Sequence, residues 1–211
     1  MHPARRFHVT DPAILRQRIL EHPFAVISAV SDGQPIVAHA PILPYSEGLP
    51  SGEGEPLKLR FHLSVANPVT KALLAGSPVL AVFTGAHAYV SPDWYGIDDQ
   101  VPTWNYISVE AAGPVTRLDD DAMRQLIDDL SDHFEAGLAP KPIWKTAKMK
   151  PARLEALYRG LVAFEIRLER FEGIAKLNQD KPASARAGVI EALDATESGF
   201  ALAAEMRKLE S

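Results

Sequence analysis

Polar side chains gather at an expected helix start in the run FHLSVANPVTK, residues 61–71. Ser64 or Asn67 can cap this helix, Pro68 suits its first turn, and Lys71 follows about one turn later. The first N–H groups of a helix have no partner inside it and favour an anion such as a phosphate. The run therefore predicts a phosphate cradle made of Ser64, Asn67 and Lys71, with an ordinary capped helix as the alternative.

Three histidines lie in or next to expected strands, namely His39, His62 and His87. An imidazole ring can bind a metal ion or transfer a proton near neutral pH. The spacing of the three matches no metal motif, so half-buried histidines that hydrogen-bond the backbone are the favoured alternative to a metal site. They also suit hydrogen bonding to the polar edge of a planar ligand.

The segment from Tyr89 to Tyr106 holds two of the three tryptophans and three of the five tyrosines of the chain. A buried Trp or Tyr needs a partner for its N–H or O–H group. Such a density next to loop residues therefore favours a ligand wall or a subunit interface over plain core packing.

A basic stretch runs from Lys141 to Arg153 and contains no acidic residue. Its charged and aromatic members are Lys141, Trp144, Lys145, Lys148, Lys150 and Arg153. Cations interleaved with an aromatic ring can contact nucleic acid. A solvated linker is the favoured interpretation in a chain of net negative charge, and an anion site completed for a partner subunit is a further alternative.

The net charge and the cysteine count argue against several classes of protein. The 211 residues carry a formal net charge of −5 and contain no cysteine. The charge argues against a strongly basic DNA-binding domain, and the lack of cysteine excludes disulfides, cysteine zinc sites and thiol catalysis. We expect a cytoplasmic protein without a signal peptide or membrane span, folded as a single domain over residues 1–211, with a C-terminal helical extension over 182–211 packed on it.

The elements that must position these residues are mainly strands with a few helices. Hydrophobic periodicity and turn residues predict helices over 11–22, 64–74 and 118–138, and further helices after Pro182. Strands are predicted over 24–31, 35–43, 57–63, 79–84, 103–116, 160–170 and 171–177, and a glycine-rich surface loop over 45–56. Asp32-Gly33 is a two-residue turn signal that joins the first two strands in a β-hairpin. The alternation over 57–63 predicts a half-buried strand with Lys58, Arg60 and His62 on its polar face. Neither a GxGxxG nor a GxxxxGK[ST] motif is present, so the pattern favours an α+β or barrel architecture over a doubly wound sheet.

Several motifs together resemble the PaiB family in order and spacing over nearly the whole chain. They are HLSVANP (62–68), FTGAHAYVSP (83–92) followed by Trp94-Tyr95, VPTWNY (101–106), LVAFEI (161–166) and KLNQ (176–179). The resemblance implies an α+β, mainly β fold: an FMN-binding split β-barrel of the pyridoxamine-oxidase type with flanking helices. It also implies a homodimer with FMN in clefts between the subunits.

The resemblance places the FMN phosphate at the cradle of residues 64–71. It places the flavin ring alongside His39, His62 and a turn over residues 84–87, and it leaves open which subunit supplies each contact. The cofactor contacts that it implies are His39, His62, Leu63, Ser64, Asn67, Lys71, Thr84, His87, Trp104, Asn105, Tyr106, Lys176 and Gln179. One departure concerns the last motif, where the family often reads KLSQN and this chain has Asn178 and then Asp180. The added carboxylate places an anion contact there in doubt.

The resemblance implies a negative transcriptional regulator, although no helix-turn-helix pattern accompanies the basic stretch. The competing hypothesis is a flavin-dependent oxidoreductase or a haem-degrading enzyme, with His62, His87 or Tyr106 as proton donors. A dimeric scaffold without bound flavin is the third alternative. Whether the protein is an enzyme thus stays open from the sequence.

Overall fold

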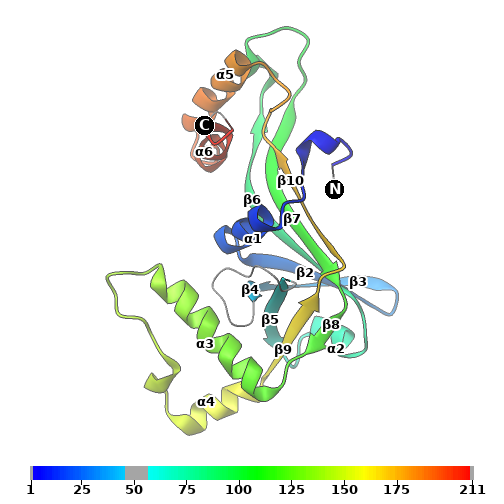
Figure 1. Cartoon of the computed structure of the whole chain (residues 1–211), viewed down its shortest axis with the longest axis vertical. Coiled ribbons are helices and arrows are strands. Elements are labelled where there is room, and N and C mark those ends of the chain that lie inside the picture. The colour runs from blue at the N-terminus through cyan, green and yellow to red at the C-terminus, as the bar shows by residue number, and fades with distance from the viewer. Residues whose placement is uncertain (1, 46–56, 210–211) are drawn as a thin grey trace. The chain divides into compact units, whose positions relative to one another are not determined.

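The computed structural model describes residues 2–45 and 57–209, which fall into two compact units (Figure 1). Unit 1 comprises Met1–His22, Phe83–Val109 and Glu172–Ser211, and unit 2 comprises Pro23–Val82 and Glu110–Phe171. Three strands, β6 (Val79–Val90), β7 (Thr103–Gly113) and β10 (Arg170–Lys176), have residues in both units. The single domain expected from the sequence stays a prediction, and the loop expected over 45–56 lies outside the described residues after Tyr45.

Unit 2 begins with the expected hairpin. Strands β2 (Phe24–Ser31) and β3 (Gln34–Pro41) pair antiparallel, and Asp32 and Gly33 between them have φ values of 51° and 73°. Two left-handed residues are what a type I′ turn requires, so the Asp-Gly signal is confirmed. The first residues of β6 pair with the other edge of β2, with Ala81 opposite Ile27.

A four-stranded antiparallel sheet completes unit 2, in the order β4 (Leu43–Tyr45), β5 (Lys58–Ser64), β9 (Leu161–Arg167) and β8 (Val115–Arg117). Fully buried Phe61 and Phe164 lie opposite each other on β5 and β9, with ring centroids 5.5 Å apart. Helix α3 (Asp120–Ala136) buries Met123, Leu126 and Leu130 in a cluster that also contains Tyr158 of α4 (Pro151–Tyr158). The helix that hydrophobic periodicity predicts over 118–138 is thereby confirmed as α3.

Unit 1 contains η1 (Arg5–Phe7), β1 (His8–Val9), α1 (Pro12–Glu21), η2 (Pro92–Tyr95), α5 (Ala183–Asp194) and α6 (Phe200–Arg207). Strand β1 pairs antiparallel with β10, with His8 opposite Ile174. The core of this unit joins β6 and β7 to both C-terminal helices, through residues such as Val90, Ile107 and Leu202. In Figure 1 the two helices lie side by side next to the distal part of β6.

Two local predictions were wrong. The Gly85 region is not a turn, because β6 continues from Val79 to Val90; a Cβ at Gly85 would lie 3.2 Å from Ile107 Cβ, so the glycine permits a close passage of two strands. The stretch read as a linker contains η3 (Thr146–Lys148) and helix α4, which has Pro151 at its first position.

Candidate functional site

The β5–α2 region, defined as residues 60–71, joins the end of β5 to helix α2 (Pro68–Leu74). Asn67 Oδ1 accepts a hydrogen bond from Val69 N at 2.8 Å, and Thr70 Oγ1 donates to Ser64 O at 2.8 Å. Of the two caps that the sequence allows, Ser64 and Asn67, the asparagine is therefore the one used, and the buried Thr70 anchors the loop from inside.

The backbone amides of this loop differ from the expected cradle, because they already have partners. Val65 N donates to Gly160 O at 2.9 Å, Asn67 N to Ser64 O at 3.0 Å, and Ala66 N to Ser64 Oγ at 3.3 Å. The polar groups left facing solvent are the exposed side chains of Ser64 and Lys71. No acidic side chain in the described residues pairs with Lys71. Any anion here must be held by side chains.

The polar face of β5 is more deeply buried than its alternation predicts. Arg60 is 8% exposed, its Nε donates to Glu165 Oε2 at 2.7 Å, and its guanidinium carbon lies 3.3 Å from the ring centroid of Tyr45. Tyr45 on β4 covers this predicted polar face at Arg60. The neighbouring strand and a cation–π contact thus account for the difference.

His62 follows Arg60 on the same face of β5 and is half-buried. Burial lowers the pKa of its ring below 6.5, so the ring is neutral at pH 7. Its Nδ1 is buried and has no hydrogen-bond partner among the described residues. An unpaired buried nitrogen on β5 and an exposed lysine in α2, within one short stretch of the chain, are groups that a polar, anionic cofactor needs. Leu63, the next residue, points into the core.

His39 belongs to the hairpin of unit 2 and is exposed on β3. Its ring stacks on Phe24 with centroids 6.1 Å apart and an angle of 22° between the planes. A stacked and exposed imidazole leaves its nitrogens accessible to a ligand.

The aromatic segment forms an open wall in unit 1. Exposed His87 and Tyr89 on β6 flank Trp104 on β7, at centroid distances of 6.1 Å and 6.5 Å from its ring. The indole of Trp104 is 55% exposed. His87 Nδ1 lies 3.0 Å from Gly85 O, and because a carbonyl only accepts, the neutral ring carries its proton there. Its Nε2 is then a hydrogen-bond acceptor.

This wall borders the aromatic pocket, a cavity of about 300 Å³ within unit 1. Its lining residues are His87, Ala88, Tyr89, Trp94, Trp104, Leu193, Thr196 and Ser198. Sequence reasoning identified the aromatic side but not the other wall, which comes from the end of α5 and the turn before α6. Tyr95 from the same segment is buried instead in the core.

The segment after β10 is held by its own turn. Gln179 Oε1 accepts from Leu177 N at 2.8 Å, and its Nε2 donates to Ala175 O at 2.6 Å. Asn178 has φ 59° and accepts a hydrogen bond from the Tyr95 hydroxyl at 3.4 Å. The Asp180 carboxylate lies 3.4 Å from the Arg6 guanidinium, so its charge has a partner.

Lys176 directs its ammonium group back to β7, where it donates to Thr103 Oγ1 and to Trp104 O. Burial lowers the pKa of this lysine. Asn105 is fully buried, with Nδ2 3.9 Å from Met206 Sδ and with Oδ1 unpartnered among the described residues. Thr84 is exposed and Tyr106 half-buried.

The predicted cofactor residues thus form two sets. Unit 2 holds His39, His62, Leu63, Ser64, Asn67 and Lys71, and unit 1 holds Thr84, His87, Trp104, Asn105, Tyr106, Lys176 and Gln179. The structure brings together the residues of 62–71 in one set and those around Trp104 and Lys176 in the other. These assignments as FMN contacts stay predictions.

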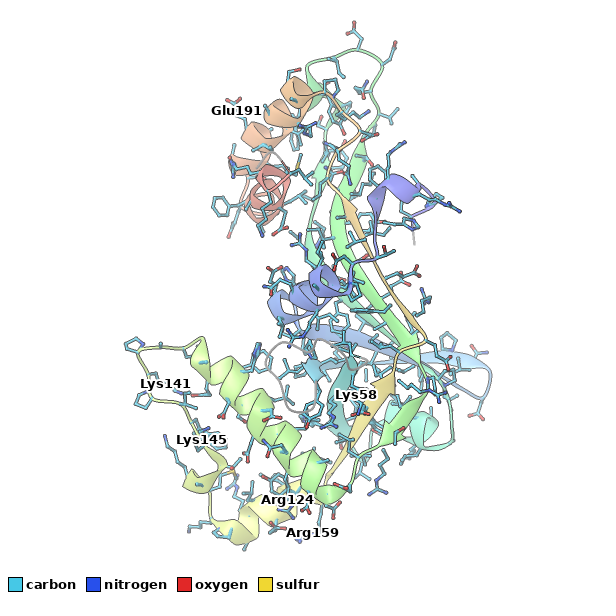
Figure 2. All side chains as sticks on the ribbon, in the orientation of Figure 1. Lys58, Arg124, Lys141, Lys145, Arg159 and Glu191 are labelled. Carbon is cyan, nitrogen blue, oxygen red and sulfur yellow. The ribbon has the colours of Figure 1, made fainter. Side chains whose placement is uncertain are left out.

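Two of the five cations of the basic stretch pair with acidic residues of α3. Lys141 pairs with Glu135 and Lys145 pairs with Asp132, and both lysines lie on the chain that leads from α3 to α4 (Figure 2). The hydrogen bond from Lys141 lowers the pKa of Glu135, which also accepts from Trp144 N at 2.8 Å. Acidic side chains of α3 therefore lie next to the basic stretch in the folded protein, although the stretch itself contains none.

The part of the chain that the structure describes contains no cluster of three or more histidine, aspartate or glutamate side chains placed to hold a metal ion. Within the same residues, no helix has the length and apolar character needed to cross a membrane.

A family model described as "Putative FMN-binding domain" matches residues 1–170. The protease synthase and sporulation protein PAI 2 of Bacillus subtilis is 28% identical over 197 residues, covering 93% of this chain and 91% of its own length. Together these matches confirm the resemblance to the PaiB family and the expected cofactor class, FMN.

Solved structures share the fold at low sequence identity. A FAD- and haem-binding protein of Mycobacterium smegmatis superposes with a TM-score of 0.57 at 19% identity, covering 85% of this chain and 78% of its own. The flavocytochrome Anf3 of Azotobacter vinelandii gives 0.56 at 16% identity, covering 82% and 72%. The expected split-barrel fold is confirmed, and the chain belongs to the family of putative FMN-binding domains.

Proposed function

We propose that this protein is a flavoprotein that binds FMN and uses it for electron transfer to or from a small molecule. The observation that carries the proposal is the match of the FMN-binding family model to residues 1–170, which include the whole β5–α2 region. Within that region an unpaired exposed lysine and an unpaired buried imidazole nitrogen offer the donors that a flavin phosphate and a flavin ring need.

In this proposal the Lys71 ammonium and the Ser64 hydroxyl hold the phosphate. Asn67 and Thr70 are positioning residues, because their hydrogen bonds fix the loop that carries Ser64. His62, neutral at pH 7, forms a hydrogen bond with the polar edge of the flavin ring through Nδ1. Exposed His39 offers a second imidazole from the same unit.

The residues of unit 1 that are predicted to contact FMN differ in how far their polar groups are already used within the protein. Lys176 is half-buried and carries a cation that donates to Thr103 Oγ1 and Trp104 O, whereas Gln179 uses both ends of its amide in its own turn and Asn105 is buried with its Nδ2 near Met206. We therefore expect Lys176→Ala to weaken FMN binding more than Gln179→Ala, whose effect would come through the shape of the turn.

FMN supplies the redox chemistry when bound, and the protein supplies binding, orientation and hydrogen bonds. The test is to purify the protein, measure its flavin absorbance, titrate the flavin-free form with FMN, and mix the loaded form with NADH or NADPH by stopped flow. Saturable FMN binding and rapid bleaching of the flavin absorbance are expected. Saturable binding without bleaching over minutes would leave a flavoprotein but reject reduction by nicotinamide cofactors, and no binding would reject the whole proposal.

The homodimer that the resemblance implies is part of the proposal, with the open face of the β2–β3 hairpin as the contact. Phe24, Val30 and Val37 project from this face and are each more than half exposed, and the register places Val37 opposite Ser28. Apolar side chains gathered on one open sheet face are typical of a subunit interface. We expect a dimer by sedimentation velocity and a monomer for Val37→Lys; a monomeric wild type would contradict this.

Transcriptional regulation in the cytoplasm is the second candidate, suggested by the family resemblance. Its support in the structure is confined to Lys148, Lys150 and Arg153, which are exposed on the basic stretch. A gel-shift series on genomic fragments, repeated at increasing salt concentration, tests direct DNA contact. Specific retardation that Lys150→Glu abolishes would favour regulation, and no retardation at any salt concentration would reject direct binding.

A further inference from the structure

We propose that the aromatic pocket of unit 1 binds a planar aromatic small molecule that carries a hydrogen-bond donor, at a site separate from the FMN site. All residues that line the pocket belong to unit 1, so the site is complete without the β5–α2 region. Three of them, Leu193, Thr196 and Ser198, also lie beyond the residues matched by the FMN-binding family model.

The ring content of the lining indicates a flat ligand. Trp94, Trp104, Tyr89 and His87 supply four ring systems, and Trp104 keeps more than half of its surface exposed. Exposing so much indole to water forgoes a substantial hydrophobic gain, which a stacked ligand would recover. The volume of about 300 Å³ is at the lower end of the range for small-molecule sites, which suits two or three fused rings.

The polar groups of the pocket indicate where the ligand carries its donor. The hydrogen bond from His87 Nδ1 to Gly85 O leaves Nε2 as an acceptor. Thr196 Oγ1 already donates to Leu193 O at 2.9 Å, whereas Ser198 is exposed at the rim. A ligand O–H or N–H group can therefore bond to His87 while the ring system lies against Trp104.

Two glycines show that the far wall is preformed. A Cβ at Gly188 would lie 2.5 Å from Trp94 O, and a Cβ at Gly199 would lie 2.6 Å from Leu193 O. Helix α5 therefore packs against η2 at backbone distance, and the turn into α6 is equally tight. A wall held this way loses little entropy when a ligand binds.

The test uses 2-naphthol as the probe, with 2-methoxynaphthalene as the matched compound that lacks the donor, in isothermal titration calorimetry with the full chain. We expect saturable binding of 2-naphthol and about threefold to tenfold weaker binding of the ether, the loss of one hydrogen bond. His87→Ala should abolish this preference. Equal binding of the two compounds by the wild type, or no saturable heat, would overturn the proposal.

Two variants and a control distinguish changes at the pocket from effects of mutation elsewhere in the protein. Trp104→Leu should weaken 2-naphthol binding about tenfold through lost stacking. Ser198→Phe, at an exposed position, should block the pocket while the circular dichroism spectrum stays unchanged. Trp144→Leu removes a tryptophan of unit 2 and should leave the affinity as it is. Wild-type affinity in Ser198→Phe, or a loss in Trp144→Leu as large as in Trp104→Leu, would refute the site.

A competition with FMN distinguishes this site from the flavin site. The family resemblance predicts that His87 and Trp104 contact the flavin ring, whereas in the second site proposed here they contact a ligand other than FMN. Saturating FMN should leave the affinity for 2-naphthol unchanged. Displacement of 2-naphthol by FMN would assign the pocket to the flavin and overturn the proposal of a second site, without affecting the proposal that the protein binds FMN.

Discussion

The β5–α2 region and the aromatic pocket differ in how the chain prepares a binding surface. In the β5–α2 region the backbone amides of residues 65–67 already have partners, and the side chains of Ser64, His62 and Lys71 are left for a ligand. In the aromatic pocket the rings themselves are the surface, and close helix packing fixes their surroundings. The β5–α2 region is therefore suited to an anionic, polar group, and the aromatic pocket to a flat ring system.

The largest expected effect is on the support of the β5–α2 region. Arg60→Ala removes a buried cation from Glu165 and from the ring of Tyr45, and we expect a loss of about 3 kcal/mol in the free energy of unfolding. Urea denaturation measures it. The matched control is Arg167→Ala on β9, whose pair with Glu169 is exposed and should contribute less than about 0.5 kcal/mol.

Arg60→Ala also tests whether the β5–α2 region and the aromatic pocket are independent of each other. Under native conditions Arg60→Ala should weaken FMN binding, because β5 carries His62, while 2-naphthol binding to the aromatic pocket stays unchanged. Equal losses at both regions would show that they are not independent.

A smaller effect is expected from the support of the aromatic pocket. Gly188→Ala places a Cβ 2.5 Å from Trp94 O, so helix α5 must shift, at a cost of about 2 kcal/mol in unfolding free energy. Gly137→Ala is the matched control, because its Cβ would lie 3.5 Å from the nearest atom, Phe134 O. Gly188→Ala should also weaken 2-naphthol binding and spare FMN binding; the reverse pattern would contradict the division into two sites.

The smallest expected effect is a pH dependence in the β5–α2 region. Burial lowers the pKa of His62 in the folded protein, so the unfolded chain takes up a proton more readily as the pH falls below about 6.5. The free energy of unfolding should therefore decrease on going from pH 7.5 to pH 5.5. His62→Gln should flatten this slope and His39→Gln should not, as measured by urea denaturation at several pH values; an unchanged slope in His62→Gln would contradict the burial argument.

The sequence predicted the β5–α2 region because all of its residues lie within a short stretch. The cap at Asn67 and the exposure of Lys71 follow from local rules of helix starts. The pairing of Val65 N with Gly160 O does not, because its acceptor lies almost a hundred residues later in the chain. The pairing of Arg60 with Glu165 escaped prediction for the same reason.

Only the aromatic side of the pocket could be predicted from the sequence. The density of rings in residues 89–106 indicated a ligand wall, but Leu193 and Thr196 carry no signal that would place them opposite Trp104. The clearest available signals were Gly188 and Gly199, glycines in or beside C-terminal helices where alanine would be the better helix former. A glycine at such a position often marks a close approach of another backbone segment.

The claim that side chains of the β5–α2 region hold the FMN phosphate is tested most directly by titrating wild type and Lys71→Ala with FMN and with riboflavin, which lacks the phosphate. We expect Lys71→Ala to weaken FMN binding by about 1 to 3 kcal/mol, as for a hydrogen bond to a charged group, and to leave riboflavin binding unchanged. Equal weakening of both flavins, or no weakening of either, would contradict the assignment of Lys71 to the phosphate.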